Sequence, residues 1–237
     1  MVNKAWRYYT NKTEEMRMIQ KFYFWVEYFR EIFAKNKFTN VYQKNLFKGK
    51  ESRSGEGSNM FQTAIIRREI PFLIKELKIK SLIDAPCGDF FWMREVELPV
   101  ERYIGVEIVK ELVEKNQNKF GNKQIIFTEL NIIKDVMPMA DMILCRDCLV
   151  HLSFKQGIQV INNFKRSGSK YLLITTFVNR LSNDDLGKSW RTINIQKPPF
   201  NFPNPIKIIN EKCTEHNGKY SDKSLGLFLL KDIHLND

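Results

Sequence analysis

Near the start of the chain, apolar and polar residues recur with the period of a helix. Residues 14–35 carry apolar side chains at helical spacing, many of them aromatic, which predicts one amphipathic helix. Such a face is typical of a core or docking surface, and a lid or an interfacial membrane helix is the alternative. The Gly/Ser-rich residues 47–58 mark the best boundary. We therefore expect an N-terminal helical extension or lid (1–50) and a main domain (51–237).

The main domain alternates helical and strand-like segments. A helix is predicted over roughly 59–78, with Ser58 or Asn59 as its cap and Pro71 bending or splitting it. Strand-like apolar runs follow at residues 80–84, 102–107, 124–129, 141–145 and 170–177. Strands that alternate with helices indicate a parallel, doubly wound sheet, whose ligands bind at the carboxyl ends of its strands.

The last third of the chain has a different pattern. Residues 205–213 and 224–233 are strand-like and separated by a turn-rich stretch, so we expect an antiparallel hairpin. The segment 178–204 is long and rich in Asn, Pro and aromatic residues. Long loops are usually functional or disordered, and the aromatic content argues against disorder.

Composition narrows the class of protein only a little. The chain has 237 residues, of which 43% are hydrophobic, and a net charge of +11. This charge permits a nucleic acid, an anionic membrane surface or a phosphorylated small molecule as partner. The lysines are spread along the chain, which favours an ordinary solvated surface.

Location and redox state are expected to be those of the cytoplasm. The apolar runs are too short for a membrane-spanning helix, and the first residues lack the apolar region of a secretion signal. Four cysteines are few for a disulfide scaffold. Cys145 and Cys148 form a C-x-x-C pair, but a zinc or redox site is disfavoured because the pair ends an apolar strand and lacks an obvious second ligand pair.

The turn after the first predicted strand carries the clearest chemical signal. In D-A-P-C-G-D the strand ends at Asp84, and Gly88 lets a ligand approach the backbone. Glu107 ends the next strand about twenty residues later, the spacing that places a carboxylate against ribose hydroxyls. A dinucleotide site would need G-x-G-x-x-G for its pyrophosphate. Here Asp84 and Asp89 flank a single glycine, which suits a ligand with an ammonium and a sulfonium, as in S-adenosylmethionine.

The motifs D-A-P-C-G-D, Y-I-G-V-E, F-T-E-L-N-I and D-M-I-L-C-R-D-C-L-V-H-L, in this order, resemble those of class I S-adenosylmethionine-dependent methyltransferases. The resemblance covers roughly 58–234. It extends to a bacterial group with S-G-x-G-S, Q-T, I-R-R-E, W-R-x-x-N and P-F-N-F-P segments, some of whose members are associated with surface-polysaccharide gene clusters. It implies a Rossmann-like α/β fold with a seven-stranded sheet, parallel except for a C-terminal hairpin.

The resemblance also implies the cofactor S-adenosyl-L-methionine, the product S-adenosyl-L-homocysteine and a set of binding residues. Glu107 would hold the ribose hydroxyls, Ile108 would contact the adenine, and the amide oxygen of Asn131 would accept a hydrogen bond from the adenine amino group. Arg67 would reach the cofactor carboxylate. The remaining cofactor-binding residues are expected to be Asp84, Cys87, Gly88, Asp89, Ile132 and Arg146.

Methyl transfer to a hydroxyl requires a base near the methyl group. His151, a few residues after the fourth strand, is the expected base because a neutral imidazole accepts protons at neutral pH, and Asp147 is the rival. The acceptor would lie against Trp190, Arg191, Phe200 and Phe202, unless these aromatic residues only close the core. No metal site is expected, because the fifth strand does not end in carboxylates.

The predicted function is O-methylation of a small polar acceptor, such as a sugar or nucleotide-sugar, in surface-polysaccharide synthesis. An RNA methyltransferase is the second hypothesis, and a non-catalytic protein that binds S-adenosylmethionine is the third. The expected partners are a small-molecule substrate and, as a possibility left open, a second copy in a homodimer, whereas nucleic acid is not favoured.

Overall fold

The computed structural model describes residues 37–185 and 190–235. The chain divides into two units, Met1–Lys44 and Asn45–Asp237. Residues 37–43 of the first unit are helical. The aromatic helix predicted over 14–35 lies outside the described residues, so its role stays a prediction.

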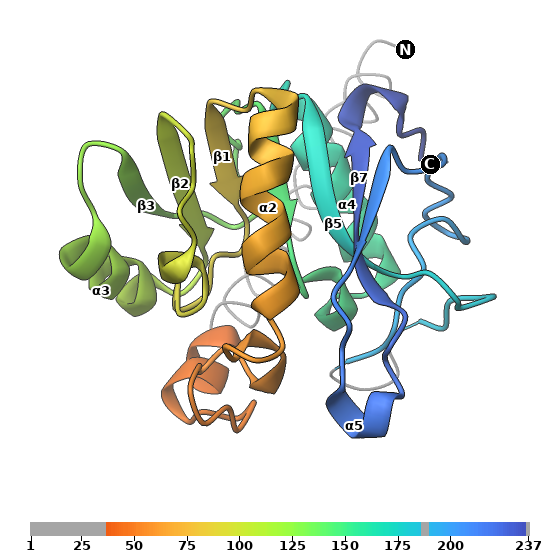
Figure 1. The fold of residues 1–237 in the computed structure, drawn as a ribbon, viewed down its shortest axis with the longest axis horizontal. Helices are drawn as coiled ribbons and strands as arrows, with labels where there is room; N and C mark the ends of the chain where they lie inside the picture. The colour runs from red at the N-terminus through yellow and green to blue at the C-terminus, as the bar shows by residue number, and fades with distance from the viewer. Residues whose placement is uncertain (1–36, 186–189, 236–237) are drawn as a thin grey trace, which may run out of the picture. The chain divides into compact units, whose positions relative to one another are not determined.

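The second unit is built on one seven-stranded sheet with the order β3-β2-β1-β4-β5-β7-β6 (Figure 1). The strands are β1 Ser81–Asp84, β2 Arg102–Glu107, β3 Ile125–Glu129, β4 Met142–Cys145, β5 Tyr171–Phe177, β6 Lys207–Asn210 and β7 Lys223–Leu229. Neighbouring strands are parallel except that β7 runs antiparallel to both β5 and β6. This arrangement confirms the predicted fold: a Rossmann-like α/β sheet with an antiparallel C-terminal hairpin.

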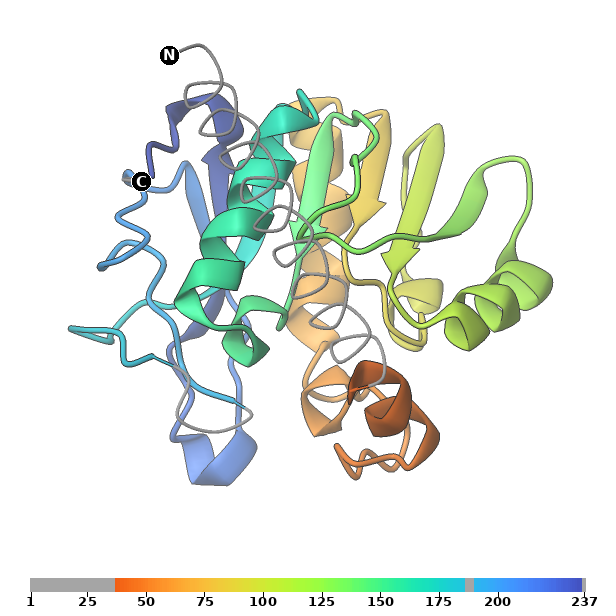
Figure 2. The ribbon, with the colours of Figure 1, turned by 180° about the vertical axis from the view of Figure 1, so that it is seen from behind.

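Helices cover both faces of the sheet. They are α2 Ala64–Leu77, α3 Lys110–Phe120 and α4 Phe154–Arg166, whereas the short α5 Glu215–Gly218 lies at the tip of the hairpin between β6 and β7 (Figure 1). Helix α2 lies on one face and α4 on the opposite face, as the two opposed views show (Figures 1 and 2). All four residues of β4 are buried, as expected for a parallel strand covered on both sides. Ser153 and Gln156 form a capping box that fixes the first turn of α4.

Helix α2 differs from its prediction at its start. It begins five residues later than residue 59, because the side chain of Asn59 accepts the N–H of Gln62 at 2.8 Å and so stabilises a turn ahead of the helix. Pro71 does not split the helix, although its ring removes one backbone donor. Burial of Ile66, Ile70, Leu73 and Ile74 holds the helix together across the proline.

The C-terminal hairpin determines which residues reach the site. Its second strand, β7, lies between β5 and β6, and Lys223 at the start of β7 pairs with Phe177 at the end of β5. Since β7 is antiparallel, its first residue lies at the same edge of the sheet as the last residues of β4 and β5. A basic side chain from the far end of the sequence is therefore placed beside Arg146 and Asp147, which follow β4.

Candidate functional site

The candidate site lies at the carboxyl ends of β1, β2 and β4. Strand β1 stands between β2 and β4, so the order of the strands reverses around it, and such a switch point is where open α/β sheets bind ligands. In Figure 1 these strand ends point downward, toward the edge where residues 45–58 and α5 also lie.

Asp84, the last residue of β1, is a buried carboxylate. Its Oδ2 accepts a hydrogen bond of 2.7 Å from the hydroxyl of Tyr103 on β2. Burial raises the pKa of Asp84 to about 7, against the opposing effects of the Tyr103 hydrogen bond and the charge of Arg146. A cation bound next to such a carboxyl group stabilises its ionised form, so this position favours the binding of a cation.

The turn after β1 is joined to the end of β2 by Glu107. Gly88 has a φ of +55°, a left-handed conformation that glycine adopts most easily. Its N–H donates to Oε2 of Glu107 at 3.2 Å, while Oε1 of the same carboxylate accepts the N–H groups of Ile108 at 2.8 Å and Val109 at 3.2 Å. Burial raises the pKa of Glu107, although these three backbone donors oppose the increase. Glu107 is therefore fixed beside the glycine turn, as the sequence predicts.

Asp89 has a partner that the sequence does not reveal. Its carboxylate accepts the hydroxyl of Ser52 at 2.9 and 3.0 Å, the N–H of Arg53 at 2.8 Å and the hydroxyl of Ser54 at 3.2 Å. We call residues 52–54 the serine strap. A Cβ added at Gly88 would lie only 2.4 Å from Oγ of Ser54. The close approach at Gly88 is thus made by the strap, whereas we expected a ligand there, and Asp89 anchors the strap.

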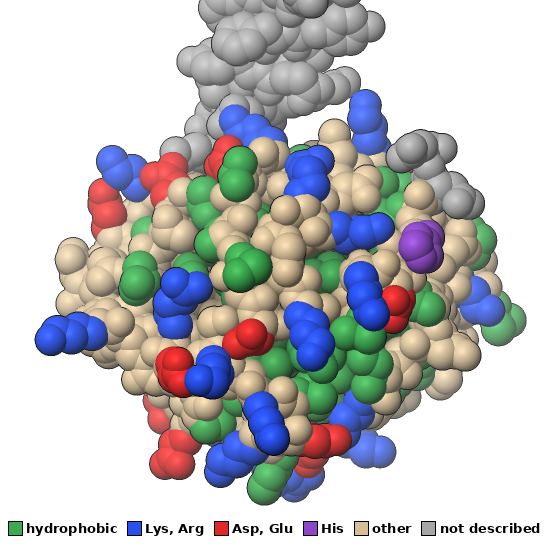
Figure 3. Space-filling model, turned by 90° about the horizontal axis from the view of Figure 1, so that it is seen from above, with side chains coloured by type: hydrophobic (Ala, Val, Ile, Leu, Met, Phe, Trp, Pro, Cys, Tyr) green, Lys and Arg blue, Asp and Glu red, His purple; other side chains and the backbone are tan. Residues whose placement is uncertain are grey.

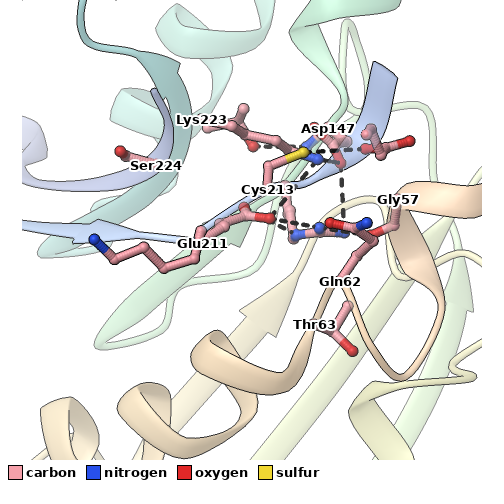
Figure 4. A network of polar contacts seen from close by, with 12 residues as sticks. Gly57, Gln62, Thr63, Asp147, Glu211, Cys213, Lys223 and Ser224 are labelled. Carbon is pink, nitrogen blue, oxygen red and sulfur yellow. Dashed lines mark hydrogen bonds and ion pairs between the residues drawn. The ribbon is translucent and has the colours of Figure 1, made fainter. Parts of the chain in front are cut away.

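A network of buried charges lies where β4 ends (Figure 4). Arg146 donates to Glu211 through Nε at 3.1 Å and through Nη2 at 2.7 Å, and its Nη2 also donates to the carbonyl of Gly57 at 2.7 Å. Lys223 Nζ lies 2.5 Å from Oδ2 of Asp147 and 3.7 Å from Oε2 of Glu211. The sequence did not predict two members of this network, Lys223 and Glu211, because they reach it through the pairing of β7 with β5, which the structure reveals.

The network keeps its members charged. Burial alone raises the pKa of Asp147, but Lys223 and Arg146 outweigh burial and hold it below its usual range. Burial alone lowers the pKa of Lys223, but Asp147 and Glu211 raise it overall. Asp147 also has a φ of +51°, which is rare for a residue with a side chain, and its N–H donates to the Thr175 hydroxyl at 2.8 Å. Its side chain remains 24% exposed, so Asp147 is the member that a bound molecule can contact.

His151 lies in a short turn after β4, Leu149–His151, immediately before helix α4. Its ring is half-buried and packs on Phe47, with ring centroids 5.0 Å apart. His151 and Asp147 thus lie on the same short connection between β4 and α4, and an electrostatic interaction with His151 is one of the smaller causes of the lowered pKa of Asp147.

Other residues that were assigned to the cofactor have local partners. Asn131 follows β3, and its side-chain oxygen accepts the N–H of Ile133 at 3.0 Å. Arg67 donates to the carbonyl of Met60 at 2.9 Å. Cys87 is buried and lies 3.0 Å from the position of a Cβ at Gly105, which makes it a packing residue under β2. Ile108 and Ile132 are half-buried near the ends of β2 and β3.

The four residues expected to line an acceptor pocket pack on different neighbours, except that Arg191 and Phe200 both contact Phe154. Trp190 packs on Phe177 and Tyr220, with centroids 6.0 and 4.9 Å apart. Phe200 is fully buried against Phe154 of α4, and Phe202 packs on Phe228 of β7. The expectation that Phe200 and Phe202 stack on an acceptor is therefore wrong, because both rings belong to the core.

Within residues 37–185 and 190–235, no group of three or more His, Cys, Asp and Glu side chains is arranged to hold a metal ion. No helix of that part is long and apolar enough to cross a membrane.

Comparison with known proteins gives only distant structural similarity. No protein-family model and no curated protein matches the chain. The N-methyltransferase NodS from Bradyrhizobium japonicum aligns over 73% of this chain and 98% of its own length, with 13% identity and a TM-score of 0.49. Magnesium protoporphyrin IX methyltransferase from Synechocystis, solved with S-adenosylhomocysteine, aligns over 62% and 71%, with 15% identity and a TM-score of 0.46.

Human N-acetylserotonin methyltransferase in complex with S-adenosylmethionine is a third example. It aligns over 48% of this chain with 17% identity and a TM-score of 0.41, and the matched region spans about a third, 34%, of the human chain. All three TM-scores are below 0.5.

Proposed function

We propose that the chain is an S-adenosylmethionine-dependent methyltransferase that methylates a hydroxyl of a small polar acceptor. The supporting observation is the position of Glu107, a buried carboxylate at the end of β2 that lies 3.2 Å from the backbone nitrogen of Gly88 in the turn after β1. On a sheet of this order, this is where a carboxylate meets the hydroxyls of a bound ribose.

The residues present suit this cofactor better than a dinucleotide. Asp84 is a buried carboxyl group with a pKa of about 7 at the switch point, and a positively charged methionine end supplies the cation that stabilises its ionised form. Glu107 would hold the ribose, and Ile108 and Ile132 would contact the adenine. The amide oxygen of Asn131 would accept a hydrogen bond from the adenine amino group. A pyrophosphate would instead meet the carboxylates of Asp84 and Glu107 in the same turn.

When bound, S-adenosylmethionine supplies an activated methyl group. The chain must then orient the acceptor and remove its proton. His151 is the proposed base. Asp147 is less suited to this role because its pKa is held low, so we assign it to orienting the acceptor by accepting a hydrogen bond. Burial of Lys223 and Arg146 beside Asp147 keeps that carboxylate in one position.

Of the acceptor classes, a sugar or nucleotide-sugar of surface-polysaccharide synthesis remains the proposal. The alternative of an RNA substrate rests on the net charge of +11 alone. Figure 3 shows the face opposite the carboxyl ends of the strands, and Lys and Arg side chains stand there among acidic and apolar ones.

The test is transfer of a labelled methyl group from S-adenosylmethionine to a panel of sugars, nucleotide-sugars and RNA. We expect label in a hydroxyl-bearing small molecule. His151→Ala should abolish most of this turnover while the affinity for S-adenosylmethionine stays the same. Full turnover in this variant would remove His151 as the base, and label in RNA alone would replace the proposed acceptor.

A further inference from the structure

Arg191 is a buried cation whose guanidinium has no hydrogen-bond acceptor within the described part of the chain. Its relative exposure is 9%, and within the described part of the chain none of the three nitrogens of its guanidinium group, Nε, Nη1 and Nη2, has a hydrogen-bond partner. The guanidinium lies over the ring of Phe154, 4.6 Å from its centroid. Folded proteins rarely leave a buried charged group without hydrogen bonds, so its nitrogens are available to an acceptor such as water or a bound anion.

Arg191 belongs to the segment after β5 whose backbone contacts the residues that follow β4 and the end of β5. Its N–H donates to the carbonyl of Val150 at 3.1 Å, next to His151 in the connection between β4 and α4. Two residues further on, the carbonyl of Ile193 accepts the N–H of Phe177, the last residue of β5, at 2.8 Å. The backbone of this segment is thus held against the ends of β4 and β5, and the guanidinium lies over Phe154, three residues after the proposed base His151.

The surroundings of Arg191 favour an anion. Phe154 fixes the plane of the guanidinium and is the first residue of the 13-residue helix α4, whose N-terminus carries a partial positive charge. The carboxylate of Asp185 opposes this, because its negative charge already acts on Arg191, although its Oδ1 also accepts the N–H of Phe154 at 3.2 Å. A planar fork of N–H donors matches the two oxygens of a carboxylate or phosphate.

We propose that Arg191 binds an oxyanion carried by the acceptor, either a phosphate or a carboxylate. This inference rests on the proposed function for the statement that the anion belongs to the acceptor. It narrows the acceptor class to anionic molecules, such as a nucleotide-sugar or a uronic acid, and excludes neutral sugars. Arg191 is a substrate-binding residue in this account and takes no part in proton transfer.

The experiment measures anion binding by calorimetry and thermal denaturation. Inorganic phosphate, uridine diphosphate and glucuronate are the probes, with chloride added to keep the ionic strength equal. The variants are Arg191→Gln and Arg191→Lys. Arg180→Gln is the matched control, because Nη2 of Arg180 donates to Asp222 at 2.8 Å and to the carbonyl of Lys219 at 2.9 Å, so the charge of Arg180 is already paired within the protein.

We expect at least one probe to bind the wild type and to raise its melting temperature. Arg191→Gln should weaken that binding by about tenfold or more, because charge-assisted hydrogen bonds are lost, and Arg191→Lys should retain part of it. Without a probe, Arg191→Gln should melt at the same or a higher temperature, whereas Arg180→Gln should melt lower. Binding of phosphate and uridine diphosphate only, or of glucuronate only, supports the proposal and names the anion.

Two results would overturn it: wild-type protein that binds none of the three anions, or Arg191→Gln protein that binds them as the wild type does. Binding of S-adenosylmethionine is measured separately in the same variants and should be unchanged. If the wild type fails to bind S-adenosylmethionine but Arg191 still binds an anion, the proposed function fails and the anion site stands.

Discussion

The hydroxyl of Tyr103 donates a 2.7 Å hydrogen bond to Oδ2 of Asp84, and both side chains are buried between β1 and β2. The tyrosine supplies one hydrogen bond to a carboxyl group whose pKa burial has raised to about 7. The buried, ionised carboxylate of Asp84 destabilises the cofactor-free protein at alkaline pH, and a bound cation would offset this destabilisation. This property makes the site testable before its acceptor is identified.

Asp84→Asn should stabilise the cofactor-free protein, and more so at higher pH. Since the folded pKa of about 7 lies above the unfolded value, the wild type binds an extra proton between about pH 4 and 7 and loses that stability as the pH rises through 7. The gain in Asp84→Asn at pH 8.5 relative to pH 4 should approach about 4 kcal/mol at most. Chemical denaturation at several pH values measures it.

Asp141→Asn is the control with the opposite sign. The pKa of Asp141 is lowered, because hydrogen bonds from Lys80 and Ser81 outweigh its partial burial. Its stabilising effect is present above the unfolded pKa, so Asp141→Asn should be less stable than the wild type at pH 8.5. If Asp84→Asn behaves like this control, Asp84 is an ordinary structural carboxylate.

Affinity for S-adenosylmethionine should rise with pH up to about 7. Below this pH the free protein holds Asp84 protonated, and binding of a cation must first displace that proton. The dissociation constant should therefore increase by up to about tenfold for each pH unit below 7, and Asp84→Asn should bind weakly without this dependence. Calorimetric titrations between pH 5.5 and 7 measure the slope, and an equal slope in Asp84→Asn would contradict the assignment.

Lys223 and Asp147 should be strongly coupled in stability. Lys223→Met leaves the buried carboxylates of Asp147 and Glu211 with Arg146 as their cation, so we expect a loss of about 3 kcal/mol. Asp147→Asn in the same background should restore part of the loss. Urea denaturation of the two single variants and the double variant gives the coupling energy, and strictly additive losses would show that the two side chains act independently.

Asp89→Ala should release the serine strap. The carboxylate of Asp89 accepts the N–H of Arg53 at 2.8 Å and the hydroxyls of Ser52 and Ser54. Without this acceptor, hydrogen exchange at Arg53 should accelerate by at least about tenfold. Glu95→Ala removes an exposed carboxylate paired with Arg94 and should leave the exchange at Arg53 unchanged. Equal exchange in both variants would mean that other contacts hold the strap.

The sequence was sufficient for elements with a clear local signal. Strand β2 was predicted with the observed limits, Arg102–Glu107, because a charged residue stands at each end of an apolar run. Glu107 ends β2 as predicted, and it meets Gly88 because consecutive parallel strands end at the same edge of the sheet. Strand β6 is shorter than its apolar run, because only Lys207–Asn210 pair with β7.

Contacts between distant segments could not be predicted from one sequence. Glu211 and Lys223 reach Arg146 and Asp147 only because β7 lies between β5 and β6. The aromatic content of 178–204 gave the same signal for a pocket and for a core, and packing against α4 and β7 places Phe200 and Phe202 in the core. The local sequence identified the residues at the strand ends, whereas only the fold shows which residues contact them.

The most direct test of the account is a calorimetric titration of S-adenosylmethionine into the wild type, Glu107→Gln and Glu129→Gln. Glu129 is the matched control because it pairs with Glu107 in register but is exposed at the end of β3. We predict that the wild type binds, that Glu107→Gln weakens binding by about tenfold or more through the loss of a charged acceptor for the ribose hydroxyls, and that Glu129→Gln binds like the wild type. Equal affinity in Glu107→Gln and the wild type, or no binding by the wild type, would contradict the account.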